Sequence, residues 1–371
     1  MIIVGTGITG VGRTHYLNGV RDYAASLGGS MDVADIGPKM FEKASSLRIN
    51  IPHNKILNLD ITTLSFLRAT VFEEITSNID NYRGLDRDLL VSLHMSFRWN
   101  KVLMPAFDYY YLNRLKPNLT CIIVDSVANI LKRMMDTPDL NHWMDRLNLK
   151  EILIWQDEEL FITKMVSDIM NIPFYMIPSS SHPSLMYDII NYVEKPRSIG
   201  DRPKKLRAYI SYPMTMVKGD EGFEEDRLEL VRRLKEKGLI IFDPVMIEDM
   251  MLLELVKEVR DKNTIYIEDL DIRIGVRDIL EAERYIIDQT VYRDYKFIDQ
   301  SDMIIIYYPI KELSAGVLSE MIYASTHMKD VYTLYTHKDI SPFFLNYSTK
   351  VFRDIDETIE YIGGLMEAKA E

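Results

Sequence analysis

Residues 1–14 read MIIVGTGITGVGRT, an apolar run followed at once by a glycine-rich turn. A short apolar run bounded by turn residues predicts a buried β-strand, and a helical pattern follows from His15 to Leu27. Glycine allows the backbone conformations that bring successive N–H groups to one side of a loop. Because the amino end of the next helix adds positive potential, the stretch predicts a loop that holds an anion.

The loop from Gly7 to Thr14 fits the phosphate-loop (P-loop) pattern G-x-x-x-x-G-K-[S/T], with arginine where lysine is usual. This fit predicts an ATP site in which the Thr14 hydroxyl reaches Mg²⁺. Arginine is a wide planar fork and lysine a compact charge, so Arg13 favours nucleotide binding over turnover. The alternative is a glycine-rich turn without a ligand. The residues predicted to bind the cofactor are Gly7, Thr9, Gly10, Val11, Gly12, Arg13 and Thr14.

Outward from this loop, strand-like and helix-like segments alternate along the chain. Strands are predicted at 88–97, 119–126, 172–180, 206–213, 239–245, 302–309 and 329–338. Helices are predicted at 100–115, 127–135, 149–171, 223–237 and 315–327, and the region up to about residue 295 is helical but poorly patterned. The alternation predicts an α/β protein with two doubly wound parallel-sheet domains, 1–195 and 206–371. Residues 196–205, PRSIGDRPKK, have no periodicity and are predicted to be the linker.

Composition excludes several classes of function. The formal net charge is −12 and no run of basic residues offsets it, so a nucleic acid polymer is not an expected partner. Without an apolar stretch of about 20 residues, no membrane span is expected. The single cysteine, Cys121, lies in an apolar run and fits a reducing compartment, so we expect a cytoplasmic protein. The scattered histidines lack the spacing of zinc ligands.

The first half resembles the archaeal-type adenylate kinases and related small nucleotide kinases. The resemblance covers roughly residues 1–195 and follows the order of MIIVGTGITGVGRT, DVADIGPKMFEKA, DLLVSLHMSF, LNRLKPNLTCIIVDSVANILKRMMD and IPFYMIPSS. It implies a P-loop domain that binds ATP and Mg²⁺. The Asp-x-His motif of that family falls on Ser92, Leu93 and His94, so its carboxylate is missing. The mobile lid of that family carries arginines that clamp the transferring phosphate, and Arg133 and Arg146 are the only nearby candidates for them.

A second group of residues surrounds Glu320 in the stretch RDYKFIDQSDMIIIYYPIKELSAGVLSEMIYAS, residues 293–325. An apolar strand leads to Gly316, which opens a helix, and Glu320 follows in its first turns. This position places the carboxylate at the carboxyl edge of a parallel sheet, where α/β folds bind ligands. Apolar neighbours at helical spacing desolvate it partly, as expected of a nucleophile. The alternative is a helix-end glutamate that only stabilises the dipole.

Residues 206–345 resemble the nucleoside 2-deoxyribosyltransferases and their nucleotide N-glycosidase relatives, a Rossmann-type fold. AYISYPM supplies Tyr209, Ser211 and Pro213, and LSAGVLSEMIYA supplies Ser314, Gly316, Glu320 and Ala324. The resemblance implies that Glu320 attacks the anomeric carbon, that Tyr209 orients it and that Asp294 handles the proton of the leaving base. Substrate binding falls to Ser211, Pro213, Ser314 and Gly316. Tyr212 stands where glycine is usual, and Ser314 where an aspartate often holds the sugar.

Three functions therefore compete. The first is an enzyme of nucleotide metabolism that cleaves or exchanges the N-glycosidic bond of a nucleoside or nucleotide and binds ATP as cosubstrate or regulator. The second is a nucleotide kinase with a regulatory nucleotide-binding second domain. The third is a nucleotide sensor without chemistry. The resemblance also allows a homo-oligomer, because transferases of this fold commonly complete their sites across a subunit interface.

Overall fold

Two units make up the chain in the computed structural model, which describes residues 1–51, 55–83, 87–99, 102–138, 140, 147–195, 204–258 and 263–368. Unit 1 comprises Met1–Tyr187 and Ile247–Gln289, and unit 2 comprises Asp188–Met246 and Thr290–Glu371. Most of the predicted linker, residues 196–203, lies outside the described residues. Residues 247–289 follow the first strands of the predicted second domain in sequence and yet group with unit 1.

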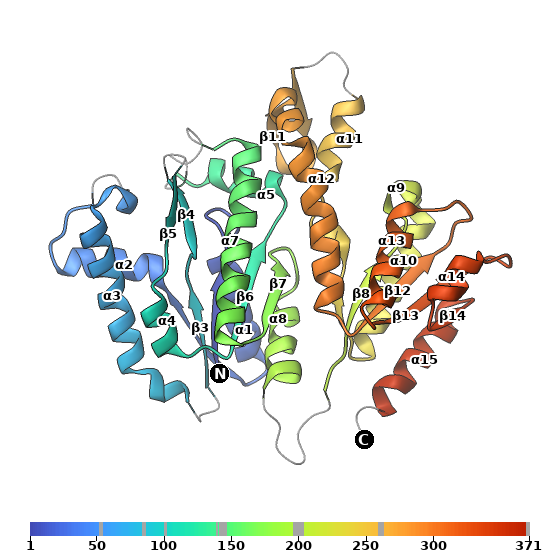
Figure 1. The fold of residues 1–371 in the computed structure, drawn as a ribbon, viewed down its shortest axis with the longest axis horizontal. Coiled ribbons are helices and arrows are strands. Elements are labelled where there is room, and N and C mark those ends of the chain that lie inside the picture. The colour runs from blue at the N-terminus through green and yellow to red at the C-terminus, as the bar shows by residue number, and fades with distance from the viewer. Residues whose placement is uncertain are drawn as a thin grey trace. The chain divides into compact units, whose positions relative to one another are not determined.

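The core of unit 1 is a parallel five-stranded sheet (Figure 1). Its strand order is β2 (Ser30–Asp35), β3 (Arg87–Ser92), β1 (Ile2–Thr6), β6 (Leu119–Val124) and β7 (Phe174–Pro178). All neighbouring pairs are parallel. The loop after β1 therefore lies at the middle of the carboxyl edge, flanked by the ends of β3 and β6. At this point the order of the strands in the sheet reverses, which is where α/β sheets open a ligand site.

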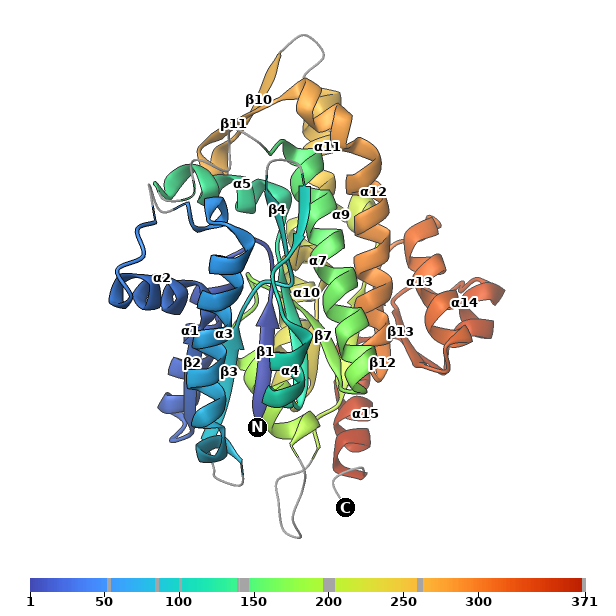
Figure 2. The same ribbon diagram turned by 60° about the vertical axis from the view of Figure 1, so that its left-hand side comes forward.

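Helices cover both faces of this sheet. On one face, α1 (Arg13–Ser26) packs so closely on β1 that a Cβ on Gly5 would lie 2.8 Å from Leu17 Cδ1. On the other face, a core joins β1 and β3 to helices that include α3 and the long α7 (Figure 2). The bounds of the other helices of unit 1 are α2 (Ile36–Ser46), α3 (Ile61–Ser77), α4 (Tyr109–Leu115), α5 (Val127–Asp136), α7 (Leu149–Met170) and α8 (Ser184–Asp188).

One prediction in this half was wrong. A helix was expected over 100–115, but the structure has a hairpin of β4 (Ser96–Trp99) and β5 (Val102–Pro105), and only α4 is helical. The pairing of Trp99 with Val102 is antiparallel. A tertiary contact stabilises the hairpin in place of a helix. The Trp155 indole N–H of α7 donates to the Ser96 carbonyl at 3.3 Å.

Unit 2 is built on a second parallel five-stranded sheet. Its order is β14 (Lys350–Phe352), β13 (Asp330–Tyr335), β12 (Met303–Tyr308), β8 (Arg207–Ser211) and β9 (Ile240–Phe242). The helices α10 (Glu221–Glu236) and α15 (Ile355–Ala368) pack on one face through a core that includes Ile210, Leu234 and Ile362. The opposite face carries the end of α12 (Val276–Asp299), α13 (Ala315–Thr326) and α14 (Pro342–Tyr347). The two sheets confirm the predicted α/β class.

Residues 247–289 add a small subdomain to unit 1. It contains α11 (Met250–Glu258), the antiparallel hairpin of β10 (Thr264–Ile267) and β11 (Ile272–Gly275), and the start of α12. The Asp249 carboxylate accepts a hydrogen bond of 2.7 Å from the Val127 amide at the start of α5.

The shorter elements of the two units are α9 (Met214–Val217), the 3₁₀ turns Ile56–Asn58, Ile79–Tyr82, Pro244–Met246 and Glu268–Leu270, and the π-helical turn Ile189–Glu194.

In the described ranges, no helix has the length and apolar character needed to cross a membrane. In those same ranges, no three His, Cys, Asp or Glu side chains lie close enough together to hold a metal ion.

A buried aromatic contact anchors the end of α12 to the sheet of unit 2. Phe297 is 1% exposed and stacks on Tyr209 and Phe242, with ring centroids 6.4 and 5.7 Å apart. We expect Phe297→Ala to lower the free energy of unfolding by about 3–5 kcal/mol through the cavity it leaves. The measurement is the urea midpoint of unit 2. The exposed Leu228→Ala should change the free energy of unfolding by about 0.5 kcal/mol or less, and equal effects of the two changes would contradict the packing described.

Candidate active site and phosphate loop

Parallel pairing of β8 with β12 brings Tyr209 and Ser211 to the carboxyl edge of the second sheet. Tyr209 lies opposite Ile304, and Ser211 lies opposite Ile306. Because side chains alternate along a strand, Tyr209 and Ser211 point to the same face. That face is the one covered by α13, whose first turn is capped by the Ser314 hydroxyl.

Glu320 of α13 contacts both of these side chains. The Tyr209 hydroxyl donates to Glu320 Oε1 at 3.2 Å, and the Ser211 hydroxyl donates to Oε2. Tyr209 and Ser211 are fully buried, whereas Glu320 is half-buried. The predicted catalytic residues Tyr209 and Glu320 are thus in contact. Ser211, predicted to bind substrate, bonds to the glutamate itself.

Asp294 is the second carboxylate of this site. It lies on α12, one turn before Phe297, and its electrostatic and hydrogen-bonding interactions are with Tyr209 and Glu320. Burial raises the pKa of Asp294 to about 6, against the opposing effect of Arg293. Burial and the neighbouring Asp294 carboxylate raise the pKa of Glu320 to about 8. Two like charges in a shared buried space cannot both ionise easily, so near neutral pH the pair holds one proton.

Burial also raises the pKa of Tyr209 well above its ordinary value, so its hydroxyl stays protonated and donates. The site therefore offers an anionic oxygen, a fixed donor that orients it, and one exchangeable proton. This combination suits nucleophilic attack on an electron-poor carbon, followed by protonation of a leaving group.

The other predicted substrate residues lie at the same edge but make different contacts. The Ser314 amide donates to the Tyr308 hydroxyl at 2.6 Å, and the Ser314 side chain caps α13. Gly316 is exposed, and a Cβ there would meet nothing closer than Ser314 Oγ at 3.9 Å, so packing does not require glycine. Pro213 is buried at the start of α9 and has no described hydrogen bond to Glu320.

Tyr212 stands where glycine is usual in the family that residues 206–345 resemble, and its side chain points away from Glu320. It follows Ser211 in β8, so its side chain faces the opposite side of the sheet, against Phe223 of α10. There its hydroxyl donates to Asp243, which also accepts from Arg227 at 2.7 Å. The bulky residue therefore takes no space beside Glu320.

In unit 1 the predicted loop does join β1 to α1, and its arginine turns inward. Arg13 donates from Nε to Ser92 Oγ at 2.8 Å and from Nη1 to the Gly7 carbonyl at 2.7 Å. Its Nη1 also lies 3.2 Å from His94 Nδ1. Burial and the nearby Arg13 charge keep the pKa of His94 well below its usual range, so the ring is neutral. The structure thus brings Arg13, Ser92 and His94 into contact.

Two further charged residues hold the loop from either side. Glu159 of α7 is fully buried and accepts hydrogen bonds from the amides of Gly7 (3.2 Å), Met95 (2.8 Å) and Ser96 (2.7 Å), and from the Ser96 hydroxyl. Arg133 of α5 donates to the carbonyls of Gly10 and Val11 and pairs with the buried Asp125. Arg146, the other predicted arginine, lies outside the described residues.

Several backbone amides of the loop are available as donors to an anion. Within the described residues, the amides of Gly10, Gly12, Arg13 and Thr14 have no acceptor, and no side chain caps α1. Gly7, Gly10 and Gly12 have φ of 146°, 81° and 87°, which other residues rarely adopt. The Thr14 hydroxyl donates to Asp35, and both side chains carry oxygen atoms of the kind that bind Mg²⁺.

Sequence reasoning missed Glu159, although a signal was present. Along α7 the buried positions Ile152, Trp155, Gln156, Glu159 and Thr163 recur at helical spacing. A carboxylate within such an apolar stripe must have partners, because an unpaired buried charge is costly. The residues it binds could not be found without the fold.

Unit 2 is thus a doubly wound α/β unit with paired carboxylates at the carboxyl edge of its sheet. No protein-family model matches the chain. Among solved structures, the chain is similar to the CMP N-glycosidase BcmB of Clostridium botulinum, with 15% sequence identity and a TM-score of 0.25. The match covers 42% of this chain and 97% of that one.

The hydrogen bonds to Glu320 predict how its pKa responds to substitution. Ser211→Ala removes a donor that favours the charged form, so the pKa of Glu320 should rise by about one to two pH units. Asp294→Asn removes a like charge, so that pKa should fall. Carbon-13 NMR titration of labelled glutamate measures both changes. Ser325→Ala on the same helix, which has no described side-chain hydrogen bond, is the control. A fall on Ser211→Ala would contradict the geometry.

Proposed function

We propose that unit 2 cleaves or exchanges the N-glycosidic bond of a nucleoside or nucleotide, with Glu320 as the nucleophile. The observation that supports this most directly is the contact of a half-buried glutamate with two buried hydroxyl donors beside a second carboxylate. A carboxylate can both stabilise an oxocarbenium-like carbon and bond to it. The fold places this carboxylate at the sheet edge where α/β proteins take ligands.

The reaction uses the singly protonated carboxylate pair in the form that has the charge on Glu320 and the proton on Asp294. Because the pKa of Glu320 is the higher of the two, bound substrate has to favour this form over the one with the proton on Glu320. A Glu320 oxygen attacks the anomeric carbon as the bond from that carbon to the base nitrogen breaks, and the electron pair of that bond stays on the base. Asp294 supplies the proton that neutralises the leaving base. The glycosyl ester on Glu320 is then resolved by water or by a second base, whose proton returns to Asp294. Tyr209 and Ser211 keep the glutamate oriented throughout.

The nucleophile is tested by replacing it with its neutral isostere. Glu320→Gln should lower the rate of base release on the order of 10⁴- to 10⁶-fold, as does loss of other nucleophiles. Chromatography of nucleosides and nucleoside monophosphates incubated with the protein measures the free base. The control is Glu360→Gln, an exposed glutamate on α15 that should retain full activity. Base release unchanged in Glu320→Gln would remove the proposed nucleophile.

The shared proton predicts a bell-shaped dependence of kcat/KM on pH. With pKa values of about 6 and about 8 for the pair, the singly protonated form predominates between them, and activity should fall on both sides. Asp294→Asn should lower activity by about 10²- to 10⁴-fold through loss of the acid. The residual activity should extend to lower pH because the pKa of Glu320 falls when the neighbouring charge is removed. A wild-type profile that stays flat from pH 5 to 9 would contradict the shared proton.

We infer further that unit 1 binds the phosphates of ATP at the loop from Gly7 to Thr14, as cosubstrate or regulator. The open amides of this loop and the oxygens of Thr14 and Asp35 support binding of ATP with Mg²⁺. The inward hydrogen bonds of Arg13 favour binding without phosphoryl transfer, since its donors already serve Gly7, Ser92 and His94. A kinase reaction is therefore the weaker alternative.

ATP binding is tested at Gly12, the glycine that directly precedes α1. Gly12→Val adds a branched side chain where φ is 87° and where a Cβ would already lie 3.5 Å from the Arg133 guanidinium. The rise in melting temperature that ATP and Mg²⁺ produce should disappear in this variant. Gly28→Val is the matched control, since Gly28 has φ of 78° and open space around it. An ATP effect that survives in Gly12→Val but not in Gly28→Val would place the site elsewhere.

A further inference from the structure

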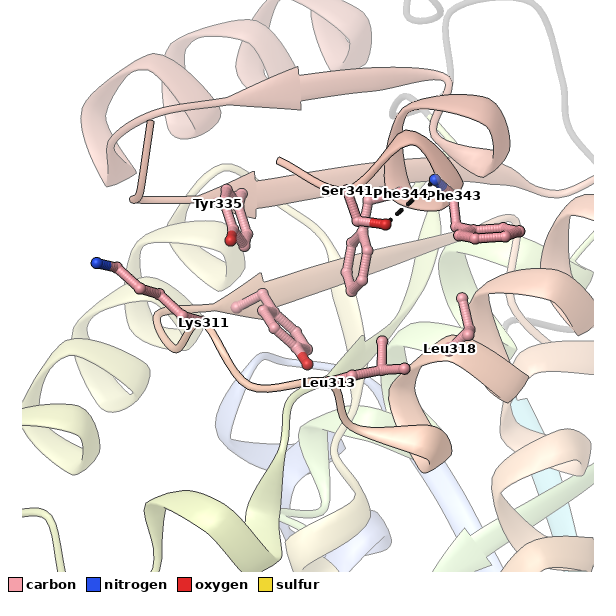
Figure 3. A pocket seen from close by; sticks show the side chains of 8 residues that line it. Lys311, Leu313, Leu318, Tyr335, Ser341, Phe343 and Phe344 are labelled. Atoms are coloured by element: carbon pink, nitrogen blue, oxygen red, sulfur yellow. Dashed lines mark hydrogen bonds between the residues drawn. The ribbon is translucent and has the colours of Figure 1, made fainter. Parts of the chain in front are cut away.

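A cavity of about 340 Å³ opens at the carboxyl ends of β12 and β13 in unit 2, between α13 and α14 (Figure 3). Its lining is mostly aromatic and aliphatic, with one cation, one serine and no carboxylate: Tyr308, Lys311, Leu313, Leu318, Tyr335, Ser341, Phe343 and Phe344. None of these residues has a role in the proposed glycosidic reaction. The volume lies in the range of small-molecule sites.

The walls of the cavity are held in place by partly buried hydrogen bonds. The Tyr308 hydroxyl donates to the Glu312 carbonyl at 2.6 Å, and the Tyr335 hydroxyl donates to the Asp339 carbonyl at 3.0 Å. These bonds fix the two loops that follow the strands. The Phe344 ring packs edge-on against Tyr308, with centroids 4.8 Å apart. The hollow is therefore part of the fold and needs no rearrangement to form.

The rim of the cavity combines exposed apolar groups with an unpaired charge. Leu313 is 60% and Phe343 is 64% exposed. Lys311 makes no ion pair with any residue that the structure describes, and in Figure 3 its ammonium group stands at the edge, away from the rings. A ligand whose ring lies inside the cavity would therefore meet the positive charge of Lys311 only with a group at the rim.

We propose that this cavity binds a planar aromatic anion, with the ring among the aromatic side chains and the negative group beside Lys311. The aromatic faces favour a ring over an aliphatic chain, because stacked and edge-on contacts add to apolar burial. The single cation with no neighbouring carboxylate in the lining favours a negative substituent. The Ser341 hydroxyl, which accepts from the Phe343 amide at 3.4 Å, can also bond to the ligand.

This site is separate from the glutamate. Leu318 lines the cavity, and Glu320 follows two residues later on α13. Two residues span about 200° around a helix, so the two side chains leave α13 on different sides. The cavity is reached from the β13 side of α13, whereas Glu320 bonds to side chains of β8. Occupation of the cavity therefore does not require the proposed reaction.

The proposal is tested with two ring systems that differ only in charge, 2-naphthoate and 2-naphthamide, by isothermal titration calorimetry of the full chain. Wild type should bind the carboxylate more tightly than the amide. Lys311→Met should weaken binding of the carboxylate by about two- to fivefold and leave the amide unchanged. Phe343→Ala should weaken both by about two- to tenfold. Both substitutions fall on exposed side chains, so the fold should persist.

The controls separate this site from other surfaces. Lys235→Met removes an exposed lysine from α10, on the opposite face of the sheet, and should leave both affinities unchanged. Glu320→Gln should also bind both compounds as wild type does. The proposal is overturned by equal affinity of wild type for the two compounds, by no binding of either, or by binding that is lost in Glu320→Gln and retained in Phe343→Ala.

Discussion

Parallel pairing of β8 and β12 is the constraint on which the second site depends. It fixes Tyr209 opposite Ile304 and Ser211 opposite Ile306, two residues apart and therefore on one face. A shift of one residue in either strand would turn both hydroxyls toward α10 and leave the carboxylate of Glu320 buried without donors. Since a buried carboxylate without partners is costly, the register and the glutamate stabilise each other. Stability and chemistry thus rest on the same contacts.

A comparison of Glu159 and Glu320 shows why burial alone does not define a reactive group. Burial raises the pKa of both Glu159 and Glu320. Glu159 accepts four hydrogen bonds, three of them from backbone amides that cannot turn away. Glu320 accepts two from hydroxyls, and its neighbour Asp294 disfavours its charge. The first carboxylate is saturated and holds the loop, whereas the second has oxygen lone pairs available for a ligand.

Strands made almost entirely of apolar residues could be predicted from the sequence. The runs MIIVGTG, LTCIIVDS and DMIIIYYP become central buried strands, because few other structures bury such runs completely. The sequence did not predict β2 or β14, whose short mixed segments gain their structure from pairing with β3 and β13. Nor could it predict that residues 247–289 group with unit 1, since the bond from the Val127 amide to Asp249 joins residues 122 apart in the chain. At the candidate site, motif spacing named Glu320 and Tyr209, but the bond from Ser211 required the register.

Arg13 shows how the choice of one basic residue affects the loop from Gly7 to Thr14. The ammonium group of a lysine is a compact charge with three donors at the end of a flexible side chain. Arg13 instead reaches the Gly7 carbonyl, Ser92 and the neutral ring of His94 with a rigid fork. The fork ties the first residue of the loop to the end of β3, so the loop keeps its curvature through protein contacts alone. Transfer of a phosphoryl group needs a charge that follows the moving oxygens. Three partners hold the Arg13 guanidinium in place, and this restraint is the reason for proposing that the loop binds a phosphate without transferring it.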